Sequence, residues 1–392
     1  MTRWIMPLVG LAVFVAALLA LMVRAGQTSY QVLDDADREL LASATTTTPS
    51  TTTTTTTSTT TTLATTTSTT TTLATTTTTT EPPYQGWVDP TTVGGPWGDT
   101  VEGVLTFRGS PTRSWHGEGP VPGDPVVAWR FPDDRMCSMT SISGEQQQWC
   151  GMGWTGQPAV FERGGRTWVV FGAYDAALHF VDGETGERLL PDFPTGDIIK
   201  GSVTVDPDGY PLVYAGSRDD RLRVLAFDRD EPVELWSLHA YDVEPTMWNN
   251  DWDSSPLVLD DHLFAGGENS RFHVVRLNRG YDADGLVTVD PVLVWDVAGW
   301  DDELLDAVGG NVSIETSPLV IGDVLYFANS GGLVQGWDIG GLRDGVEPTR
   351  VFRFWAGDDV DATLVADDEG MLYVGVEYER GTDRSHELGQ VL

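Results

Sequence analysis

The sequence is poor in basic residues, and above all in lysine. It has 23 Lys and Arg residues against 58 Asp and Glu residues, a formal net charge of −35, and Lys200 is its single lysine. Proteins that bind nucleic acids or anionic membrane surfaces contact phosphate groups through clustered Lys and Arg side chains. The composition therefore disfavours both partner classes, and its acidity serves either solubility or the attraction of cations or basic partners.

Motifs of the common catalytic sites are also lacking. The chain has no Gly-x-Ser-x-Gly, no His-Glu-x-x-His, no phosphate-binding Gly-x-x-x-x-Gly-Lys and no Cys-x-x-Cys-His sequence. Its six histidines are scattered, most of them on or beside predicted strands, so they are expected to be structural. The sequence thus favours a binding protein over an enzyme, without deciding the question.

Cysteine is almost absent, since the chain contains only Cys137 and Cys150. The pair does not form a Cys-x-x-Cys motif, and no nearby histidine completes a set of metal ligands. A disulfide between them, which an exported compartment permits, would close a loop of about 14 residues and stabilise the fold by about 3 kcal/mol. We expect the disulfide rather than a metal site.

Long hydrophobic runs are absent except at the N-terminus. Residues 5–23 are uncharged and apolar, which is long enough to span a membrane as a helix. Arg24 interrupts the small-residue pattern of a cleavage site, which favours an uncleaved signal anchor over a cleaved signal peptide. This predicts a cytoplasmic segment at residues 1–4, a single-pass transmembrane anchor at 5–23, and the rest of the chain on the extracytoplasmic side of the cell membrane.

Residues 24–80 are expected to form a disordered, Thr-rich stalk. The tract 45–80 is almost entirely Thr with some Ser, Ala and Leu, and it has too little apolar surface to offset the entropy of ordering. Such tracts are typical of O-glycosylated stalks, and the alternative is an unmodified linker. The folded domain is therefore expected at residues 81–392.

One sequence motif recurs along the part of the chain that is expected to fold. The sequence TSPLVIGDVLYFANSGGLVQGWDI at 316–339 closely matches a stretch at 254–277. β-branched and aromatic runs alternate with Gly and Asp turns, and residues 300–308 add one or two helical turns between two units. The pattern predicts an all-β fold, namely a β-propeller of four-stranded antiparallel blades. The corresponding positions, about 40 to 60 residues apart, are Pro158, Ser202, Pro256, Pro318 and Thr363.

These phrases, together with FVDGETGERL, resemble the repeats of the PQQ-like β-propeller superfamily over roughly 105–392. The Trp usual after the Asp…Thr-Gly turn is missing at 182–187, although Trp236 and Trp295 hold that place in later units. Relatives in the superfamily include quinone-dependent dehydrogenases and outer-membrane assembly lipoproteins. The quinone enzymes typically have vicinal cysteines, which this chain lacks, so the resemblance does not lead us to expect PQQ as a cofactor.

Relatives of this kind usually have seven or eight blades, whereas four units and a partial fifth are visible here. The chain is either truncated from a longer ring or closed at five blades. In the second case the stretch VVAWRF at 126–131 would supply the fourth strand of the last blade, because it matches the aromatic phrase of the other fourth strands.

In a propeller, the loops before the first strands and the loops between second and third strands lie on one face. Acidic residues dominate both loop sets, with Trp and Tyr among them. We predict an acidic, aromatic-lined mouth that holds a divalent cation such as Ca²⁺ or a sugar, the alternative being that these residues only form turns. The candidates are Trp154, Tyr174, Asp175, Arg218, Asp219, Trp252, Asp253, Glu268, Asn269, Glu315, Asn329 and Asp361.

The sequence leads us to expect a membrane-tethered, exported propeller that serves as a binding or scaffolding module in the cell envelope. Its partner would be a cell-envelope protein or a glycan, and not a nucleic acid. One alternative is a quinone-dependent oxidoreductase, and another is a fragment that cannot fold alone.

Overall fold

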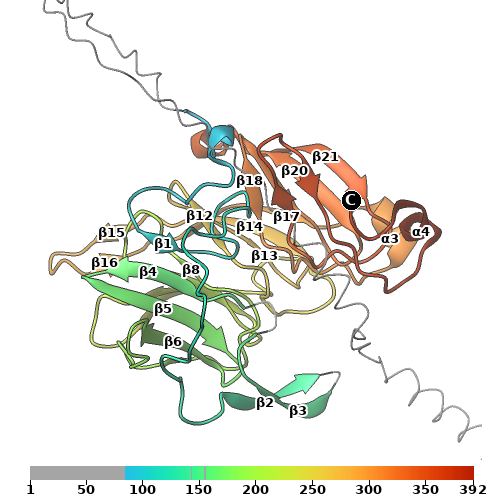
Figure 1. The fold of residues 1–392 in the computed structure, drawn as a ribbon. Coiled ribbons are helices and arrows are strands. Elements are labelled where there is room, and N and C mark those ends of the chain that lie inside the picture. The colour runs from blue at the N-terminus through green and yellow to red at the C-terminus, as the bar shows by residue number, and fades with distance from the viewer. Residues whose placement is uncertain (1–83, 143, 154–155) are drawn as a thin grey trace, which may run out of the picture. The chain divides into compact units, whose positions relative to one another are not determined.

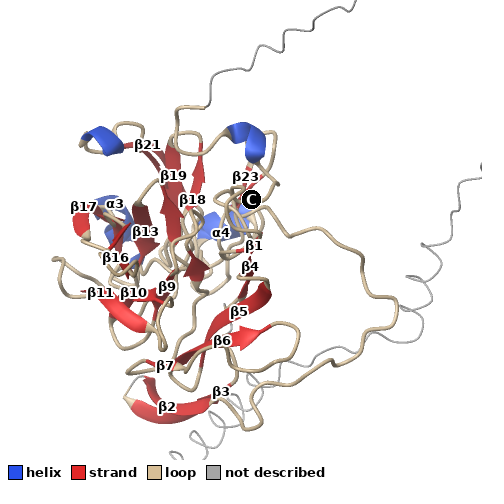
Figure 2. Cartoon of the chain, turned by 90° about the vertical axis from the view of Figure 1, so that its left-hand side faces the viewer, coloured by secondary structure: helices blue, strands red, loops and turns tan. Residues whose placement is uncertain are grey.

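The computed structural model describes residues 84–142, 144–153 and 156–392. The predicted cytoplasmic segment, membrane anchor and stalk lie outside these residues and stay predictions. Within the described ranges, no helix combines the length and the apolar character needed to cross a membrane. Strands make up most of the regular structure, with only a few short helices (Figure 2).

Antiparallel sheets follow one another along the chain, and each of the larger ones is an up-and-down meander (Figure 1). The first sheet contains β4 (Ala159–Arg163), β5 (Arg166–Ala173), β6 (Ala177–Asp182) and β7 (Phe193–Pro194). The short strand β1 (Gly103–Val104) pairs with the edge of β4 that lies opposite β5. The second contains β8 (Thr204–Val205), β9 (Leu212–Gly216), β10 (Arg221–Ala226) and β11 (Val233–His239).

The third and fourth sheets repeat the same strand order. The third contains β12 (Leu257–Leu259), β13 (His262–Gly266), β14 (Arg271–Arg276) and β17 (Val292–Ala298). The fourth contains β18 (Leu319–Ile321), β19 (Val324–Phe327), β20 (Leu333–Asp338) and β21 (Thr349–Trp355). The all-β class and the four-stranded antiparallel sheets are therefore confirmed, and this strand order is that of propeller blades.

Smaller elements join or flank these sheets. A fifth sheet has only two strands, β22 (Val365–Ala366) and β23 (Leu372–Tyr373), and no strand of it joins the first sheet in the described part of the chain. The helix α3 (Asp302–Val308) confirms the helical turns predicted there. The remaining elements are η1 (Pro90–Thr92), β2 (Cys137–Ile142), β3 (Glu145–Cys150), β15 (Gly280–Tyr281), β16 (Val287–Thr288), η2 (Leu342–Asp344) and α4 (Asp383–Leu388).

The aromatic phrases predicted as fourth strands do occupy that place in the second, third and fourth sheets. Each pairs with the third strand through a register shift, at Val224/Leu225, Val274/Val275 and Gly336/Trp337 respectively. A bulge of this kind increases the local twist of a strand. Adjacent sheets then pack face to face, as the stacked rings of Phe272 and Phe327 show with a centroid separation of 4.5 Å.

The expectation that residues 126–131 form the last fourth strand is wrong. The segment contains no strand, and it lies against the first sheet instead of the fifth. The indole nitrogen of Trp129 donates a hydrogen bond to the Gly183 carbonyl at 2.9 Å, and the Phe131 ring packs edge-on against Phe171. Gly186, at φ +74°, leaves room for the Trp129 ring, which a Cβ would meet at 2.7 Å. The aromatic side chains thus cover and bury an apolar face of β5 and β6.

Residues 103–114, which we call the axial segment, contact the first strand, or the residues just before it, in each of the five sheets described in order above. β1 pairs with β4, and the Arg113 guanidinium donates hydrogen bonds to the Pro318 and Ser255 carbonyls at 2.8 and 3.3 Å, beside β18 and β12. Backbone bonds run from Val205 N to Leu105 O, from Val320 N to Pro111 O and from Ala366 N to Thr112 O. The first strands therefore converge on one buried segment.

Candidate functional site

A cavity of about 420 Å³ opens beside the axial segment, where the first strands of the later sheets begin. We call it the axial cavity. Phe107 and Arg108 of the axial segment line one part of it. The remaining wall carries four carboxylates, from Asp253, Glu315, Asp361 and Glu377.

The repeat itself places three of these carboxylates. Asp253, Glu315 and Asp361 each stand four positions before the first residue of β12, β18 and β22. The equivalent position before β8 is Lys200. Because successive sheets are arranged around one segment, a position repeated in the sequence becomes a ring of neighbouring side chains in space. The ring described by the structure is one ammonium followed by three carboxylates.

Hydroxyl groups form a second ring two positions further along each repeat. The backbone amide of Ser255 donates to Ser317 Oγ, and the amide of Ser317 donates to Thr363 Oγ1, each at 3.0 Å. The amide of Gln157 donates to Ser202 Oγ at 2.8 Å in the same way. This ladder joins neighbouring sheets and fixes the loops that carry the carboxylates, which explains why Ser-Pro and its variants begin each unit.

Lys200 lies within a set of three acidic side chains at one side of the cavity. Its Nζ forms ion pairs with Asp253, with Glu268 at 3.1 Å and with Asp251 at 3.6 Å. Burial by itself would lower the pKa of Lys200, but the attraction of the three carboxylates outweighs it and raises the pKa. Lys200 is therefore a permanent cation of this wall, and Arg218 adds a second one through Nε at 2.6 Å from Asp251.

The set Asp251, Asp253 and Glu268 is also the one group in the described ranges whose geometry could hold a metal ion. Their ligand atoms all lie within 4.8 Å of one another. The Lys200 ammonium already stands among them, however, and a bound metal would have to displace it. The carboxylates in the rest of the axial cavity do not form a comparably compact group.

Carboxyl groups outnumber cations in the rest of the cavity wall. Burial, followed by repulsion from Asp361, Glu268 and Asp253, raises the pKa of Glu315 to about 9. Burial also raises the pKa of Asp253 well above its ordinary value, even though Lys200 opposes the shift. Asp253 Oδ1 is buried and has no hydrogen-bond partner among the described residues. The wall thus contains more carboxyl groups than its cations pair with.

The wall between the fourth and fifth sheets has a similar excess of carboxylates. Asp361 Oδ1 accepts a hydrogen bond from Ser330 Oγ at 2.8 Å, and burial raises the pKa of Asp361. Asp359, two residues before Asp361 in the chain, has its pKa raised to about 9 by burial and by the charge of Asp361. Its nearest cation is Arg380, with Nη1 3.7 Å from Asp359 Oδ2. One guanidinium thus faces a wall of several acids.

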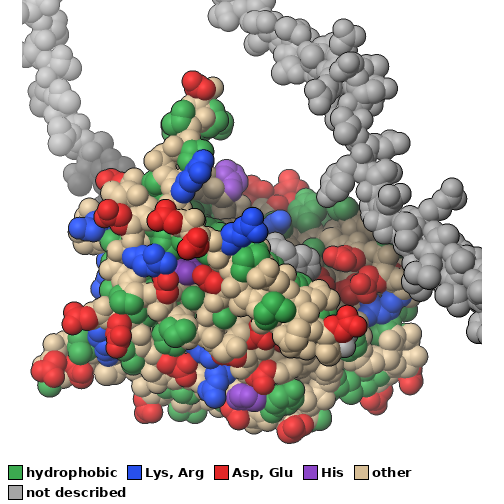
Figure 3. Space-filling view, turned by 90° about the horizontal axis from the view of Figure 1, so that it is seen from below, with side chains coloured by type: hydrophobic (Ala, Val, Ile, Leu, Met, Phe, Trp, Pro, Cys, Tyr) green, Lys and Arg blue, Asp and Glu red, His purple; other side chains and the backbone are tan. Residues whose placement is uncertain are grey.

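Five of the candidate mouth residues come together here. Asp253, Glu315 and Asp361 line the axial cavity, and Glu268 and Arg218 lie beside it through Lys200 and Asp251. On the face drawn in Figure 3, acidic side chains gather at a hollow of the surface. Lys200, Asp251 and Asp359 belong to the loops before the first strands, which the sequence placed on this face, whereas Glu377 was not expected there.

The other candidates lie elsewhere, and Trp154 is outside the described residues. Trp252 is only 1 % exposed and belongs to the core. Asp175 pairs with His179 at 3.1 Å, and Asp219 pairs with Arg223. The Asn side chains occupy equivalent turns: Asn269 Oδ1 accepts from the amide of Arg271, and Asn329 Oδ1 accepts from the amide of Leu333. These polar residues hold turns, as Asp and Asn commonly do.

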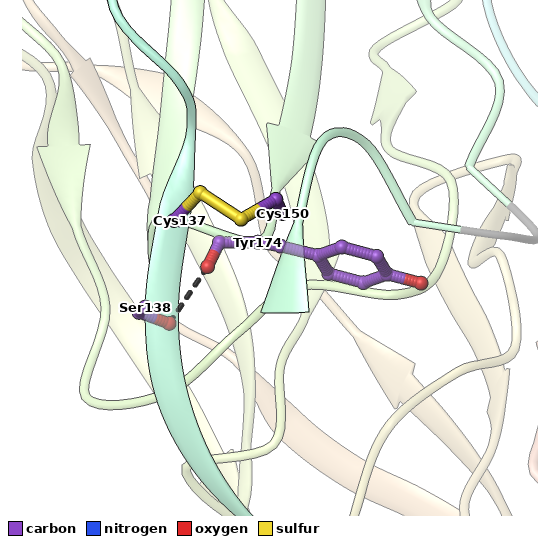
Figure 4. Close-up of a disulfide and its surroundings, with 4 residues drawn as sticks. All are labelled: Cys137, Ser138, Cys150 and Tyr174. Atoms are coloured by element: carbon purple, nitrogen blue, oxygen red, sulfur yellow. Dashed lines mark hydrogen bonds between the residues drawn. A yellow bond between two sulfur atoms is a disulfide. The ribbon is translucent and has the colours of Figure 1, made fainter. Parts of the chain in front are cut away.

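Tyr174 lies beside the predicted disulfide, which the structure confirms. Cys137 and Cys150 face each other across the hairpin of β2 and β3 and are bonded. Ser138 Oγ donates to the Tyr174 carbonyl at 2.7 Å, which ties the hairpin to the first sheet (Figure 4). The Tyr174 ring packs edge-on against Trp149 of β3. Tyr174 therefore supports the hairpin rather than the axial cavity.

No protein-family model matches the chain, and no curated protein sequence matches it. Among solved structures, BamB from Moraxella catarrhalis is similar at a TM-score of 0.37 and 15% identity, over 62% of this chain and 73% of that one. A chain in a crystal structure of the mitotic checkpoint complex is similar at a TM-score of 0.40 and 12% identity, over 60% and 65%. Similarities this weak say nothing about function, so the function has to be inferred from the cavity itself.

Proposed function

We propose that the chain is a binding module that captures a cationic ligand in the axial cavity. The observation that carries this proposal is the convergence of Asp253, Glu315 and Asp361 from three successive sheets on one cavity with too few counter-charges. Buried carboxylates repel one another, and a bound cation relieves both that repulsion and the cost of their desolvation. A cation would therefore bind there with a favourable electrostatic free energy that a neutral ligand lacks.

The same charges count against a quinone enzyme. Pyrroloquinoline quinone carries several carboxylate groups, and among the described residues the axial cavity offers it four carboxylates and one lining cation, Arg108. The residues of this cavity therefore do not fit that cofactor. Calcium is a different case, because it prefers oxygen ligands. It would have to displace Lys200 from the compact acidic set or bind across the wider cavity, so it is one of the cations that the test includes.

The place of action follows from the N-terminal sequence rather than from the described fold. We propose that residues 5–23 anchor the chain in the cell membrane and that residues 24–80 hold the folded part away from it, on the extracytoplasmic side. The disulfide of Cys137 and Cys150 supports this proposal, because disulfides persist in oxidising, exported compartments. The ligand would then be a cationic group on an envelope protein, on a glycan or in the surrounding medium.

Calorimetric titration of the full-length chain tests the proposal. Calcium, magnesium, guanidinium and alkylamines are titrated into the wild type, into Glu315→Gln/Asp361→Asn, and into the control Glu231→Gln/Asp284→Asn, which makes the same two types of substitution in exposed turns. We expect at least one cation to bind the wild type and the control alike, and the cavity variant about tenfold more weakly. Equal binding to all three proteins, or no binding of any cation, would overturn the proposal.

A further inference from the structure

Resting on the proposed cation site, we infer that the axial cavity takes a primary alkyl ammonium group. Two sources share this chemistry, namely a free diamine and the lysine side chain of a partner protein. The inference narrows the ligand class from any cation to one with three N–H donors on a narrow apolar stem.

Lys200 shows how this fold holds such a group. It occupies in the second repeat the position that Asp253, Glu315 and Asp361 occupy in the following three. Its ammonium satisfies carboxylates of two neighbouring loops at once, through Asp253 and Glu268. Further along the ring, Asp253 is followed by Glu315 and Glu315 by Asp361, and no lysine stands between these neighbouring carboxyl groups. An ammonium entering the cavity would repeat at Glu315 and Asp361 what Lys200 does within the wall.

The acceptors around the cavity suit an ammonium. Asp253 Oδ1 is buried and unpartnered among the described residues, and Asp253 is 4 % exposed and lines the cavity. The oxygens of Ser317 and Thr363 each accept one backbone amide and keep a second lone pair for another donor. Carboxyl and hydroxyl oxygens thus line the same cavity, and an ammonium group has three N–H donors with which to bond them.

Other cations fit this wall less well. A divalent metal needs a compact set of oxygens, and the only such set of three in the described ranges already contains Lys200. A quaternary ammonium needs a cage of aromatic faces, whereas Phe107 is the one aromatic residue that lines the cavity in the described ranges. Phe107 and Ala362 can instead contact the methylene stem of a primary amine.

The test compares four probes on the full-length chain by calorimetry at fixed ionic strength. These are 1,5-diaminopentane, a short peptide with one central lysine, tetramethylammonium and calcium. We expect one or both primary amines to bind about tenfold or more tightly than tetramethylammonium and calcium, because only they donate charge-assisted N–H bonds. Tighter binding of the diamine identifies a free amine as the ligand, and tighter binding of the peptide identifies a protein lysine.

Variants locate the bound amine. Glu315→Gln and Asp361→Asn should each weaken binding of the amine about tenfold, and Glu231→Gln should leave it unchanged. A peptide in which the lysine is acetylated should no longer bind, since it has lost its charge. If calcium or tetramethylammonium bound as tightly as the amines and the cavity variants abolished that binding, the cation site would stand and the ammonium assignment would fall. If no probe bound, both would fall.

Discussion

Lys200 and Asp253 stand at the same position of two successive repeats and form an ion pair across the boundary between the second and third sheets. The pair joins loops that are 53 residues apart in the sequence. It neutralises part of an acidic wall, and it leaves the equivalent positions Glu315 and Asp361 with no lysine of their own. Of the four equivalent positions, one thus carries an ammonium and three carry carboxyl groups, and this unequal distribution leaves the axial cavity acidic.

Removing Lys200 should destabilise the fold strongly. Lys200→Met leaves Asp251, Asp253 and Glu268 buried without the cation that they share, and an uncompensated buried charge costs about 3–5 kcal/mol. Urea unfolding followed by fluorescence measures the loss. Arg166→Met is the control, because Arg166 has a side chain 63 % exposed and forms only a long pair with Asp182. Similar losses in the two variants would contradict this role of Lys200.

Lys200 should also decide whether calcium binds between Asp251, Asp253 and Glu268. In Lys200→Ala the ligand atoms of Asp251, Asp253 and Glu268 keep a spacing within 4.8 Å, but the ammonium among them is gone. We expect calcium at millimolar concentration to raise the melting temperature of this variant by several degrees more than that of the wild type, since the metal replaces the lost charge. Magnesium, which dehydrates reluctantly, should do so less. A calcium response no larger than that of the wild type would show that the set cannot hold a metal.

Stability should fall with rising pH because of Glu315. Burial and neighbouring carboxylates raise its pKa from 4.5 to about 9 in the folded chain, so the folded state keeps a proton that the unfolded chain releases. The favourable contribution of this group is complete below pH 4.5 and is lost progressively as the pH rises to about 9. Glu315→Gln, which cannot ionise, should therefore melt at a higher temperature than the wild type at pH 8 and at nearly the same temperature at pH 4. A gain of equal size at both pH values would contradict the ionisation of Glu315 as the cause.

Arg113 should be essential to the convergence of the sheets. Arg113 is 1 % exposed, and its guanidinium donates to the carbonyls of Phe107, Ser255 and Pro318 from the end of the axial segment. Arg113→Ala leaves these carbonyls without donors, and each buried unsatisfied group costs about 1–3 kcal/mol. Chemical unfolding should show a loss of several kcal/mol, whereas Arg130→Ala, in an exposed stretch of the chain, should show almost none. An unchanged midpoint for Arg113→Ala would mean that the axial segment does not hold the sheets together.

Much of the fold and part of the site were accessible from the sequence. Local patterns predicted the strands, the turns and the helix at Asp302–Val308, because period and turn chemistry act between near neighbours. Aligning the repeats also placed Asp253, Glu315 and Asp361 together, since equivalent positions of successive blades must meet. The disulfide followed from the presence of only two cysteines.

The remaining features depend on contacts between distant parts of the chain. The Trp and Phe of residues 126–131 follow the same pattern as the fourth strands, yet they cover the first sheet, because an apolar face was free there. The acidic and aromatic content of the loops could not separate Asp253 from Asp219 or Trp252, since only packing decides which side chain faces a cavity and which faces a neighbour. The sequence by itself determined the repeating unit and its excess of acid. The tertiary structure decided which acids share Lys200 and which line an open cavity, because long-range pairing and burial set their electrostatic surroundings.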